Sequence, residues 1–137
     1  MVNHDEDFLK RAAAARARVD AVQPAEMDEQ IQAGAILIDV REAAEVAAGT
    51  IQGSLNIPLD QLTQRIEAHI QDRQSSIICF CRAGNRGALA AAALLDFGYS
   101  NVKTLAHGLG GVPDRLLQDG PTDTPGTEGE WPPSPEP

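Results

Sequence analysis

The apolar run from Ile77 to Phe80 constrains the fold of this chain more than any other stretch of its sequence. It has no polar alternation, and the run from Ala35 to Ile38 has none either. Such runs are typical of strands at the centre of a parallel sheet, because helices cover both faces of that sheet. The two runs therefore predict an α/β fold built on a mostly parallel sheet.

Helical and strand-like patterns alternate along the rest of the chain. The spacing of apolar residues predicts helices over residues 8–19, 24–34, 42–48, 59–70, 85–97 and 113–118. Strand-like stretches lie at residues 20–23, 35–38, 77–80 and 102–105, and a turn with a further short strand lies within residues 50–58. Strands that alternate with helices in this way favour right-handed crossovers within one sheet.

The composition is that of one compact domain and disfavours several classes of partner. The 137 residues are 42% hydrophobic, which is ordinary for a globular chain of this length. Aromatic residues make up only 4%, so we expect a core of aliphatic residues and alanine. The formal net charge of -9 disfavours binding to nucleic acid or to an anionic membrane.

The ends of the chain and its cysteines bear on location. Residues 1–7 are mainly polar and acidic, unlike a secretory signal, and no apolar run is long enough to span a bilayer. Cys79 and Cys81 are the two cysteines, and residues this close along one chain do not form an ordinary disulfide. We therefore predict a cytoplasmic protein.

Three regions are expected from the change in composition along the chain. Residues 1–20 form an N-terminal amphipathic helical extension, which we expect to pack on the domain rather than to bind a partner. Residues 21–119 form the α/β domain. Residues 120–137 hold six prolines and four acidic residues but no basic residue, so we expect a disordered tail.

The segment from Cys81 to Gly87 directly follows the central strand and leads into an alanine-rich helix. Ligands of open α/β sheets bind outside the carboxyl ends of the strands, where loop amides can converge on one point. The glycines permit such a loop, and the helix start near Asn85 adds partial positive charge. Together with Arg82 and Arg86, these groups favour a thiolate at Cys81. We interpret Cys81 as an activated nucleophile beside an anion site.

The alternative interpretation of Cys81 is an ordinary buried cysteine, because free cysteines are often buried. We apply that interpretation to Cys79. His4 and His69 lie far from both cysteines in the sequence, so no spacing of metal ligands is present. We therefore expect neither a metal nor a cofactor.

Three segments resemble the motifs of one protein family. Residues 39–42, Asp-Val-Arg-Glu, look like its Asp-x-Arg element after the central strand. Residues 49–58, Gly-Thr-Ile-Gln-Gly-Ser-Leu-Asn-Ile-Pro, are similar to its Gly-His-Ile-x-Gly-Ala-x-Asn-Ile-Pro run. Residues 81–86 look like its active-site loop. In this order, over roughly residues 22–118, the chain resembles a single-domain rhodanese, that is, a thiosulfate sulfurtransferase.

The resemblance implies a rhodanese-like domain over residues 21–119, with three layers and a central five-stranded, mostly parallel sheet flanked by helices. It also implies that a sulfane sulfur moves from thiosulfate or another donor to cyanide or a thiol acceptor through a persulfide on the active-site cysteine. Exchange of that sulfur with another protein is a further option. Neither nucleic acid nor membrane is an expected partner.

The resemblance also assigns roles to individual residues. Cys81 is the nucleophile. Substrate is held by the loop residues Arg82, Ala83, Gly84, Asn85, Arg86 and Gly87, whose amides surround the sulfur. The guanidinium groups of Arg82 and Arg86 attract and orient thiosulfate. Asp39, Arg41 and Asn56 are expected to brace loops through hydrogen bonds.

The sequence departs from the family pattern in two places. Thr50 replaces a customary histidine, and we expect this change to alter the support of a loop rather than the chemistry. Residues 105–111 differ from the usual Leu-x-Gly-Gly segment followed by tryptophans, which puts the acceptor site in question. His107 in this segment is interpreted as a rim or capping residue rather than a catalytic one.

Two other readings of the cysteine loop stay open. Cysteine-dependent phosphatases and arsenate reductases also hold a thiolate under a ring of amides, but they place one residue more between the cysteine and the arginine than the four found here. The shorter loop favours a single sulfur over a tetrahedral oxyanion. A rhodanese-like module that binds an anion or a partner without turnover is the second alternative, although such modules commonly lack the cysteine.

Overall fold

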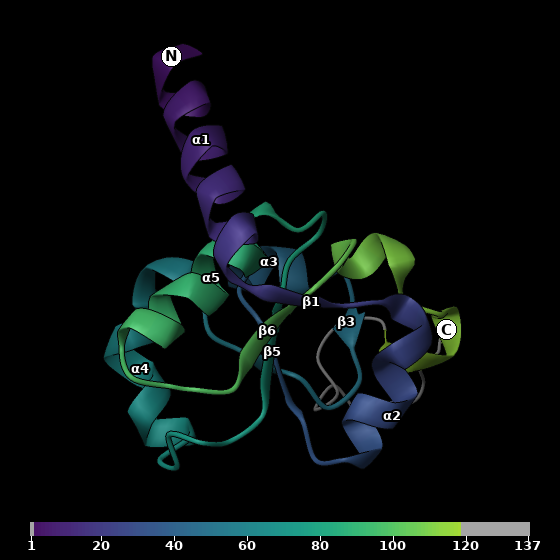
Figure 1. Ribbon diagram of the computed structural model, residues 1–137. Coiled ribbons are helices and arrows are strands. Elements are labelled where there is room, and N and C mark those ends of the chain that lie inside the picture. Colours follow the sequence, from purple (N-terminus) through teal and green to yellow (C-terminus); the bar gives the residue numbers. More distant parts are fainter. Residues whose placement is uncertain (1, 119–137) are drawn as a thin grey trace.

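A computed structural model describes residues 2–118 of the chain, and its centre is a single parallel sheet (Figure 1). Every neighbouring pair of the five strands is parallel. From one edge to the other the order is β1 (Asp20–Val22), β6 (Val102–Leu105), β5 (Ile77–Phe80), β2 (Ile36–Asp39) and β4 (Leu55–Asn56). The predicted α/β fold with a central five-stranded sheet is confirmed. The expected tail at residues 120–137 lies outside the described residues.

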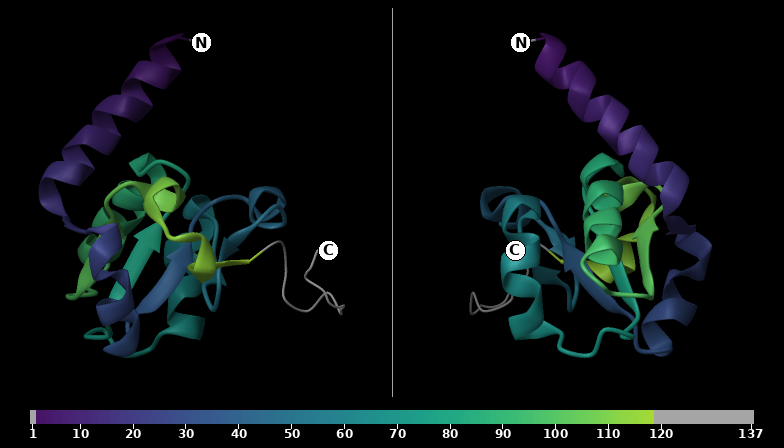
Figure 2. Two further views of the ribbon diagram at one scale, coloured as in Figure 1. Left: turned by 90° about the vertical axis from the view of Figure 1, so that its right-hand side faces the viewer. Right: turned by 60° about the vertical axis from the view of Figure 1, so that its left-hand side comes forward.

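Helices connect the strands and cover both faces of the sheet, so the fold has three layers (Figures 1 and 2). The α-helices are α1 (Val2–Arg18), α2 (Met27–Gln32), α3 (Ala43–Val46), α4 (Leu62–His69) and α5 (Asn85–Asp96). Short 3-10 helices are η1 (Pro24–Glu26), η2 (Leu59–Gln61), η3 (Gly108–Gly111) and η4 (Asp114–Leu116). Helices α4 and α5 lie on one side of the sheet and α2 on the other (Figure 1).

The alternation of side chains along β5 divides the core into two halves. Ile77 and Cys79 point to the side of α4 and α5, where aliphatic residues and alanines surround them. Ile78 and Phe80 point to the opposite side, where Met27 of α2 contributes. All four residues of β5 are buried, as expected for a central strand.

Helix α1 packs on α5 through small side chains near its carboxyl end. Ala12, Ala15 and the following Val19 are buried there, and Arg18 forms an ion pair with Asp96. The amino-terminal part of the helix projects away from the domain (Figures 1 and 2). None of the helices within residues 2–118 combines the length and the apolar character needed to cross a membrane.

The expected helix over residues 113–118 is wrong. The chain forms the single turn η4 and then a strand, β7 (Leu117–Gln118), which pairs antiparallel with β3 (Thr50–Ile51) in a second, two-stranded sheet. Leu116 and Leu117 contact the core on the side of α2. A helix this short gains few hydrogen bonds for the cost of nucleation, so pairing with an open strand edge prevails.

The stretch over residues 50–58 also differs in detail from the expectation. It holds two short strands, β3 and β4, rather than one, with a tight turn at Gly53 between them. Strand β3 leaves the main sheet to pair with β7, whereas β4 is the edge strand beside β2. The apolar pattern predicted extended backbone here, but the partners depend on residues distant in the sequence.

Candidate active site

Cys81 lies immediately after β5, at the carboxyl edge of the sheet. Its Sγ atom accepts hydrogen bonds from the backbone N–H groups of Gly84, at 3.1 Å, and Gly87, at 3.3 Å. The side chain is only 2% exposed. Backbone N–H groups directed at a sulfur stabilise negative charge on it, and the first turn of α5 adds its partial positive charge. The loop is therefore built around this sulfur, although the sulfur lies deep.

Two glycines give the loop its shape. Gly84 has a φ of +125°, in the region that residues with a Cβ rarely adopt. At Gly87 a Cβ would lie 2.9 Å from Thr104 Oγ1 and 3.1 Å from the Cys79 carbonyl oxygen, too close for a real side chain. The absence of a side chain thus lets the start of α5 approach β5, which brings the Gly87 amide to the sulfur.

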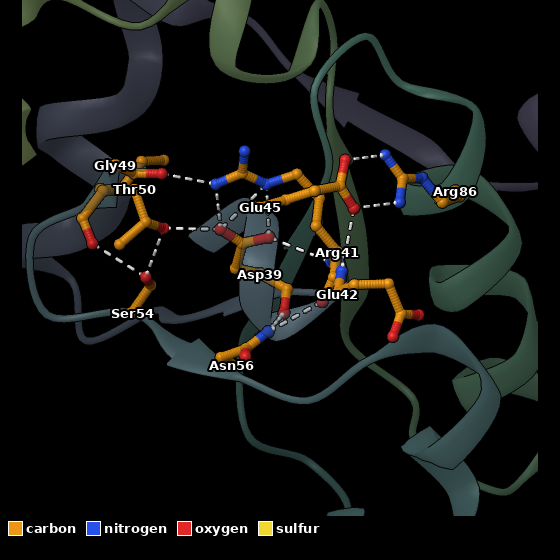
Figure 3. Close-up of polar contacts among 10 residues, drawn as sticks. Asp39, Arg41, Glu42, Glu45, Gly49, Thr50, Ser54, Asn56 and Arg86 are labelled. Atoms are coloured by element: carbon orange, nitrogen blue, oxygen red, sulfur yellow. Dashed lines mark hydrogen bonds and ion pairs between the residues drawn. The ribbon is translucent and has the colours of Figure 1, made fainter. Parts of the chain in front are cut away.

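Arg86 is already paired. Its guanidinium donates two hydrogen bonds to Glu45 of α3, at 2.7 and 3.0 Å, and both side chains are 30% exposed (Figure 3). Hydrogen bonds from Arg86, together with one from the backbone N–H of Glu42, lower the pKa of Glu45 to about 2. The hydrogen-bonded carboxylate of Glu45 in turn raises the pKa of Arg86. The predicted thiosulfate-orienting arginine therefore also links the cysteine loop to α3.

Arg82 is in the opposite situation. Its side chain is exposed and makes no hydrogen bond or ion pair with the residues that the structure describes. Ala83 is exposed beside it. Arg82 is therefore a loop cation whose charge is free to meet an approaching anion, whereas Arg86 is paired with Glu45.

A buried ionic network joins the end of β2 to the segment over residues 49–56 (Figure 3). Arg41 donates from Nε and Nη2 to the Asp39 carboxylate, at 3.0 and 2.8 Å, and both side chains are almost fully buried. Arg41 also donates to the Gly49 carbonyl oxygen at 2.6 Å. Asn56 Nδ2 donates to the carbonyl oxygens of Asp39 and Arg41, at 2.9 and 3.0 Å. These side chains bond to one another and to backbone carbonyl oxygens, and such bonds hold neighbouring segments of the chain together.

Thr50, which stands where the family pattern has histidine, belongs to the same network. Its hydroxyl donates to Asp39 Oδ2 at 2.6 Å and lies 3.2 Å from Ser54 Oγ (Figure 3). The side chain is 5% exposed. Thr50 thus supplies a hydrogen-bond donor to the buried carboxylate of Asp39, and its effect on loop support stays a prediction.

The segment after β6 forms a rim pressed against the cysteine loop. Leu109 N–H donates to the Cys81 carbonyl oxygen at 2.9 Å. At Gly108, with φ +56°, a Cβ would lie only 2.5 Å from the carbonyl oxygens of Cys81 and Arg82. His107 is exposed beside them and makes no hydrogen bond with any described residue. The interpretation of His107 as a rim residue rather than a catalytic one stays a prediction.

Sequence reasoning missed two residues at this site, Glu45 and Arg16. Glu45 is the third residue of a capping box that opens α3, a pattern that predicts its bond to the Glu42 amide but not its pairing with Arg86. Arg16 of α1 donates to the Asn85 side chain. Among residues 2–118, no group of histidine, cysteine and acidic side chains is arranged to hold a metal ion.

Comparison with known proteins gives one consistent family. The family model described as "Rhodanese-like domain" matches residues 23–112. A tRNA uridine(34) hydroxylase of Xanthomonas campestris is 33% identical over 109 residues, which are 72% of this chain and 43% of that protein. The thiosulfate sulfurtransferase PspE of Escherichia coli is 32% identical over 66 residues, 48% of this chain and 64% of that one.

Solved structures agree with this match. A structure described as "rhodanese with anions from E. coli" superimposes with a TM-score of 0.57 at 29% identity, over 64% of this chain and all of that one. The chain spans less than half the length of the hydroxylases that it matches.

Proposed function

Because this chain belongs to the rhodanese-like domain family, we propose that it is a sulfurtransferase that carries a sulfane sulfur on Cys81 and takes it from thiosulfate. The observation that carries the proposal is the pair of N–H groups, from Gly84 and Gly87, directed at Cys81 Sγ. A loop that already stabilises charge on one sulfur suits a persulfide, whose outer sulfur is also an anion.

The proposed reaction has two steps. In the first, the Cys81 thiolate attacks the outer sulfur of thiosulfate, a new S–S bond forms, and the S–S bond of thiosulfate breaks to release sulfite with its electron pair. In the second, cyanide or a thiolate attacks the outer sulfur of the persulfide. Thiocyanate or a new persulfide leaves, and the Cys81 thiolate returns. No oxidant or cofactor is consumed.

The surroundings of Cys81 support a small anionic donor. Cys81 is 2% exposed, so a slender molecule is better suited to reach its sulfur than a bulky one. Arg82 is exposed and pairs with none of residues 2–118, so its charge attracts such an anion, and Arg86 adds a second guanidinium to the loop. Both cysteines are free in the structure, which supports our proposal of a reducing, cytoplasmic location.

The test is the mass of the intact protein after incubation with thiosulfate. We expect a gain of one sulfur atom, which the Cys81→Ser variant loses and the Cys79→Ser variant keeps. Cys79 is a matched control because burial raises the pKa of its thiol to about 12. A mass gain that persists in Cys81→Ser would show that Cys81 is not the thiol that carries the sulfur. Thiosulfate:cyanide turnover, measured beside phosphatase activity on the same preparation, decides between the two reaction classes.

A second candidate is a role in tRNA uridine modification, favoured by the 33% identity to tRNA uridine(34) hydroxylase. The net charge of -9 weighs against direct contact with a polyanion. Titration of labelled tRNA with the protein tests it: binding in the micromolar range at physiological salt would favour this candidate.

A further inference from the structure

Arg16 of α1 reaches the cysteine loop from outside the matched domain. Its Nη1 atom donates to Oδ1 of Asn85, the first residue of α5. Asn85 lies between Gly84 and Gly87, the two residues whose amides contact Cys81 Sγ. The family match begins at residue 23, so this contact comes from a helix that the family model does not include.

Packing holds the helix that carries Arg16 in place, while the Arg16 side chain itself is exposed. Ala15, which directly precedes Arg16, and Ala12, about one helical turn earlier, are 4% and 0% exposed where α1 packs on α5. Arg18 pairs with Asp96 at the opposite end of α5. Figure 1 shows the carboxyl end of α1 beside the start of α5. The position of Arg16 thus follows from the docking of α1.

The chemistry of the contact fixes the orientation of the Asn85 amide. Arginine carries donors and no acceptor, so the atom of Asn85 that faces it must be the carbonyl oxygen. The amide nitrogen is then directed away from Arg16, and it makes no hydrogen bond with any described residue. Without Arg16 the amide is free to rotate, and its oxygen would repel an approaching anion.

We propose that Arg16 is a positioning residue of the sulfur site, which holds the Asn85 side chain so that its NH2 group, rather than its oxygen, meets an anionic reagent at Cys81. For the reaction itself this inference rests on the proposed function, since thiosulfate is the anion concerned. The preference for anions is nevertheless a property of the loop, and it can be measured without sulfur transfer.

The test compares two alkylating reagents of nearly equal size, anionic iodoacetate and neutral iodoacetamide. Each forms a C–S bond to Cys81 as iodide leaves, and intact mass gives the rate. The ratio of the two rates measures the preference of the site for an anion. The Cys81→Ser variant shows any background, which should be small because Cys79 is fully buried.

We expect Arg16→Ala to lower the iodoacetate-to-iodoacetamide ratio by about three- to tenfold, the effect of one hydrogen bond and its charge. Arg16→Lys, which keeps a charged donor, should restore part of the ratio. Arg18→Ala is the matched control, because it removes a similar contact of α1 at the far end of α5. It should leave the ratio unchanged.

A double-variant cycle separates positioning from simple charge. If Arg16 acts through Asn85, the variant Arg16→Ala/Asn85→Ala has the same ratio as Asn85→Ala alone. The proposal is overturned if the effects of the two substitutions on the ratio multiply in the double variant. It is also overturned if Arg16→Ala leaves the ratio unchanged, or if Arg18→Ala lowers the ratio as much as Arg16→Ala does. A protein with the expected ratios that gains no sulfur from thiosulfate would refute the proposed function and leave this inference standing.

Discussion

The Glu45–Arg86 pair allows the sharpest prediction about the support of the cysteine loop. We consider the variant Glu45→Gln, which removes the charge and keeps the shape of the side chain. The drop in the pKa of Glu45 from 4.5 to about 2 corresponds to at most about 3 kcal/mol of stability at neutral pH. Both side chains are 30% exposed, so solvent screening reduces the expected loss to about 1–2 kcal/mol.

The pH dependence follows from the direction of the change. The folded state holds the pKa of Glu45 below its unfolded value, so the stabilisation is complete above about pH 5 and is lost as the pH falls toward 2. Urea unfolding of the wild type and Glu45→Gln, repeated from pH 7 down to pH 2.5, should give a difference that is constant above pH 5 and shrinks below it.

The control for this prediction is Asp28→Asn, which removes the ion pair between Asp28 and Arg115. That pair is more exposed, with side-chain exposures of 49% and 62%, so its loss should cost less at pH 7. The reasoning is refuted if Glu45→Gln is as stable as the wild type at pH 7. It is refuted equally if the difference between them persists unchanged at pH 2.5.

Three further substitutions follow from the geometry. Gly87→Ala should cost about 1–3 kcal/mol and slow sulfur uptake from thiosulfate, because the added Cβ meets Thr104 Oγ1 and displaces the start of α5; normal uptake rates would contradict this. In urea unfolding, Thr50→Val should lower the free energy of unfolding by about 1–3 kcal/mol, since it removes the hydroxyl donor to buried Asp39. Thr50→Ser, which keeps a hydroxyl, should retain most of the wild-type stability in the same measurement. Arg82→Ala should raise the KM for thiosulfate without a change in Tm, because Arg82 bonds to no described residue; an equal fall in Tm would show a structural role instead.

Local sequence predicted the part of the site that local geometry determines. The buried strand β5, the glycines after it and the start of α5 are adjacent in the chain, so their pattern was sufficient to place Cys81 under convergent amides. The partners of Arg86 and Asn85 lie 41 and 69 residues away in the sequence. Nothing in the spacing of these residues indicates such contacts, because they depend on how α1 and α3 dock.

The wrong expectation about residues 113–118 also arose because a contact between distant parts of the chain decides the structure there. Residues 113–118 carry a weak helical pattern, yet β7 forms there because β3 offers a free edge and the core accepts Leu116 and Leu117. The bond from Thr50 to Asp39 joins β3 to the end of β2, a pairing that the local sequence does not indicate.

The alternation along β5 has a consequence for the sulfur that we propose Cys81 to carry. Cys79 and Cys81 lie two positions apart on the same side of the sheet, and the Cys79 thiol is sealed in the core with its pKa raised to about 12. Cys79 is thus a poor resolving thiol, and the chain holds no third cysteine to intercept the persulfide. If Cys81 carries a persulfide as we propose, we expect its lifetime to depend on acceptors other than Cys79.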